Sequence, residues 1–196
     1  MGAHGGRRIT ARCSGRRLRA AAERVIVSRN MEADHVEFVD ESTIRAIVLS
    51  VFEDLRTTLE ELLPGARIEH VGATAVPGAV TKGDLDICVL VERNAFDGAD
   101  RVLAEHYARN IGSDHTGSLS SFVVSSKPVP VGVQLVVREG EEDFFVRWRD
   151  LLPRSPEVLK NYNQIKRRWH GLAHGGYRVA KSEFIETTLR AARDAG

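Results

Sequence analysis

Residues 70–91 read HVGATAVPGAVTKGDLDICVLV. The second half of this stretch has the composition of a buried strand, with Asp84 and Asp86 at its start. Burying one unpaired carboxylate costs free energy, and a second like charge close by raises that cost. We therefore expect either a cation between the two carboxylates or a carboxylate that faces water.

The two aspartates lie two residues apart, so in a strand their side chains point to the same face and can share a cation. Hard oxygen ligands suit Mg²⁺ or Mn²⁺, which bind carboxylates together with substrate phosphates. The small turn that starts at Gly72 and Ala73 lets a backbone approach a phosphate. The stretch thus predicts a metal and nucleotide site, with the alternative that the aspartates simply end a strand.

Apolar periodicity places the other elements along the chain. Helices are expected over residues 41–63, 94–109, 142–151, 156–171 and 178–194, and strands over 67–71, 84–91, 120–126 and 131–137. Pro64-Gly65 ends the first helix. Pro153 and Pro156, then Gly175-Gly176, separate the last three helices.

The strands over 120–126 and 131–137 are joined by a hairpin-like connection. Pro128 and Pro130 in that connection favour an edge strand or irregular pairing. The order of elements predicts an α+β fold, in which a small mixed β-sheet is flanked by helices and followed by a helical C-terminal part.

Composition limits the classes of protein to consider. With 196 residues, 42% hydrophobic residues and a formal net charge of +1, the chain fits one globular domain with an appendage. No apolar stretch approaches the roughly 20 residues of a membrane span, so we expect a cytoplasmic protein with no membrane partner. Cys13 and Cys88 make no disulfide framework, and Cys88 is expected to be a small buried residue.

The N-terminal segment differs from the rest of the chain. Residues 1–30 hold eight arginines against one acid, Glu23, so we expect 1–34 to be a basic, disordered tail and 35–196 a single domain. An organelle leader, a nucleic-acid arm, or a protein that starts at Met31 are the alternatives. Without the tail the chain is acidic, which disfavours nucleic acid as a partner.

The stretch HVGATAVPGAVTKGDLDI resembles the signature of the GrpB-like family (UPF0157-type), which is close to H-h-G-S-T-A-V-P-G-h-x-x-K. It is also similar to the DNA-polymerase-β-type nucleotidyltransferase superfamily, in which a glycine turn precedes a [DE]-h-[DE] strand. VGVQLVV (131–137) resembles the family's next core strand, and YNQIK with YRVAKSEFI resembles its paired Tyr-x-x-x-Lys helices. The resemblance covers about residues 35–192 and implies a nucleotidyltransferase-like fold.

The resemblance also implies roles for single residues. Asp84 and Asp86 would be catalytic and would bind Mg²⁺ or Mn²⁺, and a second group would bind the nucleotide and its phosphates: Gly72, Ala73, Thr74, Lys82, Lys166 and Lys181. The implied reaction moves a nucleoside monophosphate from an NTP to a hydroxyl group of an unidentified small-molecule or macromolecular acceptor. From the residues alone, the pairs Tyr162–Lys166 and Tyr177–Lys181 fit equally well as surface pairs.

Two positions depart from the family pattern. Ala73 stands where serine is usual, although Thr74 next to it offers a hydroxyl. Active members carry a third carboxylate on the strand over 131–137, and the candidate positions here, Gly132 and Gln134, are not acidic. Glutamine can coordinate a metal through its carbonyl but is no general base. A catalytically weak or inactive nucleotide- or metal-binding module on the same fold is therefore the alternative function.

Two further alternatives stay open. His70, just before the turn, either contacts phosphate, orders Asp84, or is a packing residue at a strand end. The basic run Lys166–Arg168, together with the tail, would suit an RNA-binding protein, if it formed part of a continuous basic surface.

Overall fold

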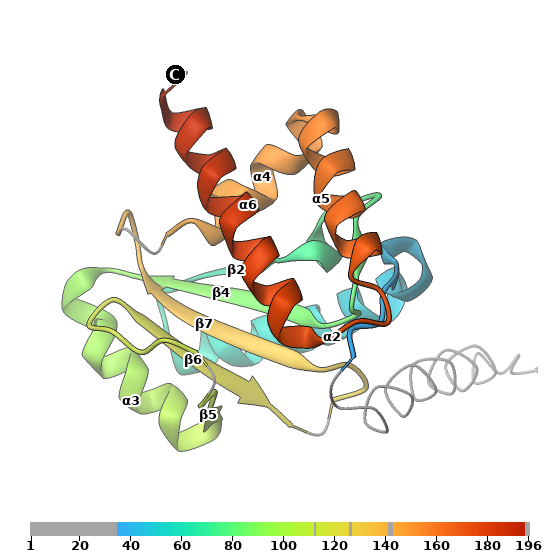
Figure 1. Ribbon diagram of the computed structural model, residues 1–196. Helices are drawn as coiled ribbons and strands as arrows, with labels where there is room; N and C mark the ends of the chain where they lie inside the picture. Colours follow the sequence, from blue (N-terminus) through green and yellow to red (C-terminus); the bar gives the residue numbers. More distant parts are fainter. Residues whose placement is uncertain (1–34, 112, 126, 141–142, 195–196) are drawn as a thin grey trace, which may run out of the picture.

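The computed structural model describes residues 35–111, 113–125, 127–140 and 143–194 (Figure 1). The predicted basic tail, 1–34, lies outside the described residues. In the part of the chain that is described, no helix combines the length and the apolarity needed to cross a membrane.

A five-stranded mixed sheet is the centre of the described structure. Its order is β2-β4-β7-β6-β5, with bounds β2 (Arg67–Val71), β4 (Leu85–Val91), β7 (Val131–Val137), β6 (Leu119–Val124) and β5 (Ala108–Arg109). The central strands β4 and β7 run parallel, and every other neighbouring pair is antiparallel. A two-stranded ladder joins β1 (Val39–Asp40) to β3 (Val80–Thr81). The small mixed sheet expected from the sequence is confirmed.

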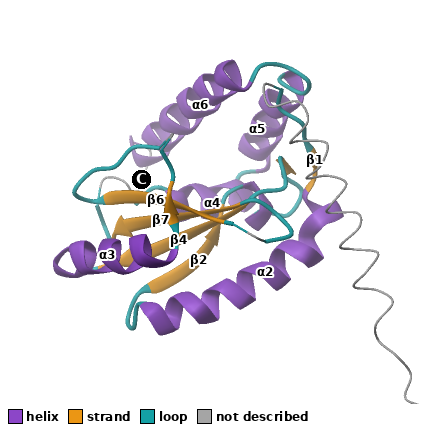
Figure 2. Ribbon diagram, turned by 90° about the horizontal axis from the view of Figure 1, so that it is seen from below, coloured by secondary structure: helices purple, strands orange, loops and turns teal. Residues whose placement is uncertain are grey.

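Helices cover both faces of the sheet (Figures 1 and 2). One face packs on α2 (Glu41–Leu62) and α3 (Phe96–His106) in the largest buried cluster of the described residues. The other face lies below α4 (Phe145–Arg154), α5 (Pro156–Arg168) and α6 (His174–Asp194). Two short 3₁₀ segments, η1 (Ala73–Ala75) and η2 (Arg93–Ala95), precede β3 and α3. The helical C-terminal part is confirmed.

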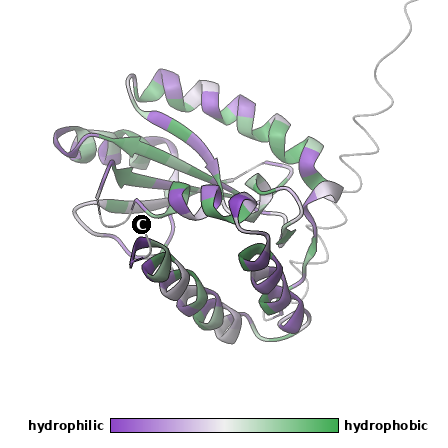
Figure 3. Cartoon of the chain, turned by 90° about the horizontal axis from the view of Figure 1, so that it is seen from above, coloured by the Kyte–Doolittle hydropathy of each residue, from purple (hydrophilic) through white to green (hydrophobic). Residues whose placement is uncertain are grey.

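The burial of β4 explains why residues 85–91 form an interior strand of the sheet. Leu85, Ile87 and Val89 are fully buried in the core with α2 and α3, whereas Cys88 and Leu90 pack on the opposite face. Because both faces are covered beyond Asp86, the strand reads as a continuous apolar run rather than an alternating one. Figure 3 shows the result: the sheet is mostly hydrophobic in colour, and the helices are banded.

Several predicted boundaries were wrong. The helix predicted over 94–109 ends at His106, because Ala108 and Arg109 pair with β6 at the edge of the sheet. Gly175-Gly176 do not separate helices: α6 begins at His174 and contains both glycines. A Cβ at Gly176 would lie 2.2 Å from the Trp169 ring, so glycine there lets α6 approach the end of α5. Pro153 lies inside α4, in its last turn.

The pairing of β6 with β7 also differs from the expectation. The hairpin is present and regular over six residue pairs, and β7 is an interior strand between β4 and β6. The prolines do not disturb it because both precede β7, and the carbonyl of Pro130 accepts a hydrogen bond from the Leu85 N–H at 2.8 Å.

Candidate functional site

A cleft of about 440 Å³ lies between the sheet and helices α4–α6. Its floor is the face of β4 and β7 that carries Asp86 and Gln134. Most residues predicted from the sequence line it: Gly72, Ala73, Lys82, Asp84, Asp86, Lys166 and Lys181. The fold therefore brings these residues together, including two lysines far along the chain from the aspartates.

The Asp86 carboxylate lies between two glycines. Val71 pairs with Asp86 at the end of β2, and Gly72 follows it with a φ of +74°. A Cβ at Gly72 would approach Asp86 Oδ2 to 2.3 Å. On the other side Gly132 is the register partner of Asp86, and a Cβ there would lie 3.4 Å from Oδ1. The two neighbouring strands thus leave room for this carboxylate by lacking side chains.

The two aspartates repel each other and lie among lysines. Asp84 Oδ2 is 2.9 Å from Lys82 Nζ, and both side chains line the cleft and are partly exposed. Burial, and secondly the charge of Asp84, raise the pKa of Asp86 to about 6, while Lys181, Lys82 and Lys166 oppose that rise. A cation between the carboxylates would relieve this repulsion, so the donor set fits a hard divalent metal ion.

His70 and Thr74 fix the backbone at the start of the aspartate strand. The Thr74 hydroxyl donates to the Asp84 carbonyl at 3.0 Å, and His70 Nε2 lies 3.0 Å from the same hydroxyl oxygen. The His70 ring stacks on Phe52 with 5.1 Å between centroids. Burial and then the charge of Arg149 lower the pKa of His70 to about 4. Because the Thr74 hydroxyl already donates to the Asp84 carbonyl, its oxygen is left to accept from Nε2. Of the roles considered for His70, ordering Asp84 agrees with this geometry.

Thr74 is buried, and it is not among the described residues that line the cleft. Because its hydroxyl is engaged with the Asp84 carbonyl, the structure places it behind the turn rather than toward a ligand. Its role in phosphate binding stays a prediction, and the geometry gives it a positioning role.

Lys166 is buried on the inner face of α5. Its Nζ donates to the Val80 carbonyl at 2.5 Å and lies 3.9 Å from the centroid of the Tyr162 ring. Burial, and then the charge of Lys181, hold the pKa of Lys166 well below its ordinary value. The Tyr162–Lys166 pair is therefore an interior contact rather than a surface pair, and it leaves Arg167 and Arg168 as the exposed part of the basic run.

Asn163 was missed by the sequence interpretation. Its side-chain carbonyl accepts from the Val80 N–H at 2.8 Å, and its amide donates to the Gly78 carbonyl at 2.9 Å. Together with Lys166 it attaches α5 to residues 78–80, just before Lys82 and Asp84. A polar residue on the buried face of an amphipathic helix was the available signal.

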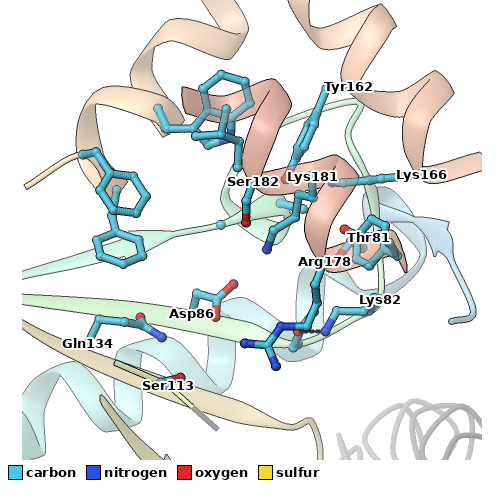
Figure 4. A pocket seen from close by; sticks show the side chains of 18 of the residues that line it. Thr81, Lys82, Asp86, Ser113, Gln134, Tyr162, Lys166, Arg178, Lys181 and Ser182 are labelled. Atoms are coloured by element: carbon cyan, nitrogen blue, oxygen red, sulfur yellow. Dashed lines mark ion pairs between the residues drawn. The ribbon is translucent and has the colours of Figure 1, made fainter. Parts of the chain in front are cut away.

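Besides the buried Lys166, three cationic side chains line the cleft near the aspartates. Lys82 precedes β4, whereas Arg178 and Lys181 come from one side of α6. Figure 4 shows Lys181 and Arg178 pointing down from α6 toward Asp86 and Lys82. The sequence interpretation included both lysines but missed Arg178, which follows Tyr177 directly.

Gln134 projects from β7 into the cleft, two residues beyond Gly132. Its Oε1 atom is buried and has no hydrogen-bond partner among the described residues. No group of three or more His, Cys, Asp and Glu side chains in the described ranges is arranged to hold a metal. The potential metal ligands are thus two carboxylates and one amide oxygen.

Aromatic side chains form another part of the cleft wall, and the sequence interpretation missed them. Phe144, Phe145 and Trp148 line the cleft at the start of α4, and Ile185 lines it from α6. Trp148 is buried and makes edge contacts with Tyr162 and Phe184. No sequence motif marked these residues, because α4 is placed over the sheet by tertiary packing.

A family model and a related protein both match this chain and point to the same family. The family model described as GrpB protein matches residues 46–191. A UPF0157 protein of Vibrio cholerae serotype O1 is 35% identical over 158 residues, which cover 80% of this chain and 83% of that protein.

One solved structure agrees on the fold. The crystal structure of the conserved protein GrpB from Enterococcus faecalis superposes with a TM-score of 0.53 at 15% identity, covering 72% of this chain and 94% of that one. That likeness shows the fold, as expected from the sequence. The Cid1 poly(U) polymerase superposes with a TM-score of 0.46 at 12% identity over 74% of this chain and 45% of its own length, which is too distant to carry a conclusion.

Proposed function

This chain belongs to the GrpB family, and on that premise we propose that it transfers a nucleoside monophosphate from an NTP to a hydroxyl acceptor in a reaction that depends on a divalent metal. One observation carries the proposal. Asp84 and Asp86 lie in one cleft with Lys82, Arg178 and Lys181, so metal ligands and phosphate-binding cations are gathered around the same space.

The metal, Mg²⁺ or Mn²⁺, would be held by Asp84 and Asp86. When bound, it would supply charge stabilisation for the phosphoryl oxygens. Gly72 lets the backbone lie close to the Asp86 carboxylate. The hydrogen bond from the Thr74 hydroxyl to the Asp84 carbonyl holds the backbone from which the two carboxylates project.

The cations Lys82, Arg178 and Lys181 would bind the phosphates and stabilise the charge that builds up on them. The acceptor hydroxyl would form a bond to the α-phosphorus while the bond to pyrophosphate breaks, and pyrophosphate would leave with the β- and γ-phosphates. Asp86, which lines the cleft beside these cations, would take the hydroxyl proton.

A thermal-shift titration tests the site first. The intact chain is titrated with Mg²⁺ or Mn²⁺ and each NTP, beside a variant that carries Asp84→Asn and Asp86→Asn. We expect stabilisation by metal plus nucleotide in the native chain and none in the variant, followed by pyrophosphate release once an acceptor is added. Absence of any shift in the native chain would refute a nucleotide site in this cleft.

A second candidate function is a nucleotide- or metal-binding module without turnover. The observation in its favour is Gln134, an amide in the strand where active nucleotidyltransferases carry a third carboxylate. In that case metal and NTP stabilise the chain, but no pyrophosphate is released with any acceptor.

We propose a nucleotide and a hydroxyl acceptor as partners, and the cytoplasm as the location, where the buried free thiol of Cys88 would stay reduced. RNA is a less favoured acceptor, since burial of Lys166 interrupts the basic run on α5.

A further inference from the structure

The cleft changes character along strand β4. Lys82 lies before the strand, and the α6 cations reach the same end (Figure 4). Toward the other end of the strand, Phe145 packs on the cluster that contains Cys88 and Leu90. Asp86 therefore separates a charged part of the cleft from an aromatic part.

Phe144 is an aromatic residue of the cleft wall whose ring is partly exposed and can stack on a ligand. Its ring is half-buried, belongs to none of the buried clusters of the described residues, and stacks on Phe145 with 4.3 Å between centroids and 23° between planes. Phe145 is anchored against the sheet, and Trp148 behind it is held by Tyr162 and Phe184. This wall is thus supported from behind by packed side chains.

Gln134 adds a polar group to the aromatic part. Its Oε1 atom is buried in the cleft floor with no hydrogen-bond partner among the described residues. A buried acceptor left unpaired costs free energy, and a ligand that donates to it would remove that cost. An aromatic wall beside one unpaired acceptor suits a flat ring that carries an N–H or O–H group.

We propose that Phe144, Phe145, Trp148 and Gln134 form a subsite for a planar, uncharged aromatic ring of a substrate, which stacks on Phe144 and donates a hydrogen bond to Gln134. The inference rests on the proposed function, in which the charged part of the cleft takes the phosphates. The ring belongs either to the base of the nucleotide or to the acceptor. Either source would offer a flat ring for stacking on Phe144 and a hydrogen-bond donor for Gln134.

The test uses one ligand without a ring and one with a ring, so that binding to the charged part and to the aromatic part of the cleft can be measured separately. Calorimetry on the full chain compares Mg²⁺ with tripolyphosphate, which has no ring, and Mg²⁺ with each NTP, in the native protein and in Phe144→Ala. We expect Phe144→Ala to bind tripolyphosphate as the native chain does and to bind the preferred NTP roughly tenfold more weakly, as expected for loss of one stacked ring. Phe144→Tyr, which keeps the ring, should restore the affinity.

A second measurement identifies the source of the ring. If Phe144→Ala leaves NTP affinity unchanged, 4-hydroxybenzyl alcohol is titrated into the chain with Mg²⁺ and tripolyphosphate, again with calorimetry as the readout. Weaker binding in Phe144→Ala than in the native chain would then assign the ring to the acceptor. Unchanged binding of both the NTPs and the alcohol would overturn the proposal.

Failure of the proposed function gives a different result. If the native chain does not bind Mg²⁺ with tripolyphosphate, the phosphate site is refuted, whatever the aromatic wall does. The subsite is then judged with adenosine, guanosine, cytidine and uridine alone: binding lost in Phe144→Ala and kept in Phe144→Tyr supports it, and absence of such a loss refutes it.

Discussion

The Asp86 carboxylate lies against the backbone of Gly72, so close that a Cβ at position 72 would come within 2.3 Å of Oδ2. Gly72→Ala would therefore both strain a residue with φ +74° and displace the carboxylate. We expect this variant to lose about 1–2 kcal/mol of unfolding free energy from the backbone alone. We also expect it to lose the stabilisation by metal and nucleotide, measured by thermal shift.

Gly65→Ala is the matched control for this variant. Gly65 has φ +87° and no heavy atom within 4 Å of its would-be Cβ, so alanine there brings backbone strain without displacing a site residue. The control should lose similar stability and keep the full response to metal and nucleotide. Equal ligand responses in the two variants would show that the position of the Asp86 carboxylate is not set by Gly72.

The raised pKa of Asp86 predicts a pH-dependent stability for the metal-free chain. Since the folded protein holds this proton up to a pH of about 6, the folded state binds more protons than the unfolded state between about pH 4 and pH 6. Stability attributable to Asp86 is therefore present at low pH and lost as the pH rises through about 6. Asp86→Asn removes this dependence.

We expect Asp86→Asn to be more stable than the native chain at pH 7.5 in EDTA, by an amount on the order of 1–3 kcal/mol, and to differ less at pH 4.5. Urea unfolding at both pH values measures the difference. Adding Mg²⁺ at pH 7.5 should stabilise the native chain only. A native chain that gains stability relative to the variant between pH 4.5 and pH 7.5 would contradict the assignment of repulsion between Asp84 and Asp86.

The aspartates and the glycine turn could be predicted from sequence because their geometry is local. Asp84 lies directly before β4 and Asp86 within it, two residues apart along the chain, and Gly72 is separated from that strand only by a short turn and β3. The pairing of Val71 with Asp86 then brings the turn to the carboxylate. The sheet and most helices followed from apolar periods for the same reason.

The direction of Lys166 could not be predicted, because it depends on how α5 packs. The Tyr-x-x-x-Lys spacing is the same on α5 and α6, and both lysines line the cleft, yet Lys166 is buried and donates to the Val80 carbonyl. Arg178 and Phe144 were missed since only tertiary packing carries α6 and α4 over the sheet. The early start of α6 was missed because Gly176 looks like a helix breaker and serves as a close contact with Trp169.

Lys166 and Lys181 should therefore differ in their mutational effects. Lys166→Met leaves the buried Val80 carbonyl without its donor, so we expect a loss of about 1–3 kcal/mol of unfolding free energy. Lys181→Met should change stability little and weaken binding of Mg²⁺ with tripolyphosphate. Urea unfolding and calorimetry on both variants provide the comparison. A Lys166→Met chain as stable as the native one would show that the contact with Val80 contributes little.

Gln134 decides between the two candidate functions. A carboxylate at Gly132 would need a Cβ 3.0 Å from Gln134 Nε2 and 3.4 Å from Asp86 Oδ1, whereas the side chain at 134 already projects into the cleft. Position 134 is therefore the better place for a third acid. Gln134→Glu would add a negative charge beside Asp86, so we expect a further rise of the Asp86 pKa in the metal-free chain and tighter binding of Mn²⁺.

Pyrophosphate release then separates the functions, measured with Mn²⁺, the preferred NTP and a panel of hydroxyl acceptors. If the native chain is an active enzyme that uses Gln134 to bind its substrate, Gln134→Glu should slow release while metal binding tightens. If the native chain is a binding module that lacks only a third carboxylate, Gln134→Glu should release pyrophosphate faster than the native chain. The native chain should then release it no faster than the variant with Asp84→Asn and Asp86→Asn. Tighter Mn²⁺ binding is expected in both cases, so its absence would show that position 134 does not reach the metal.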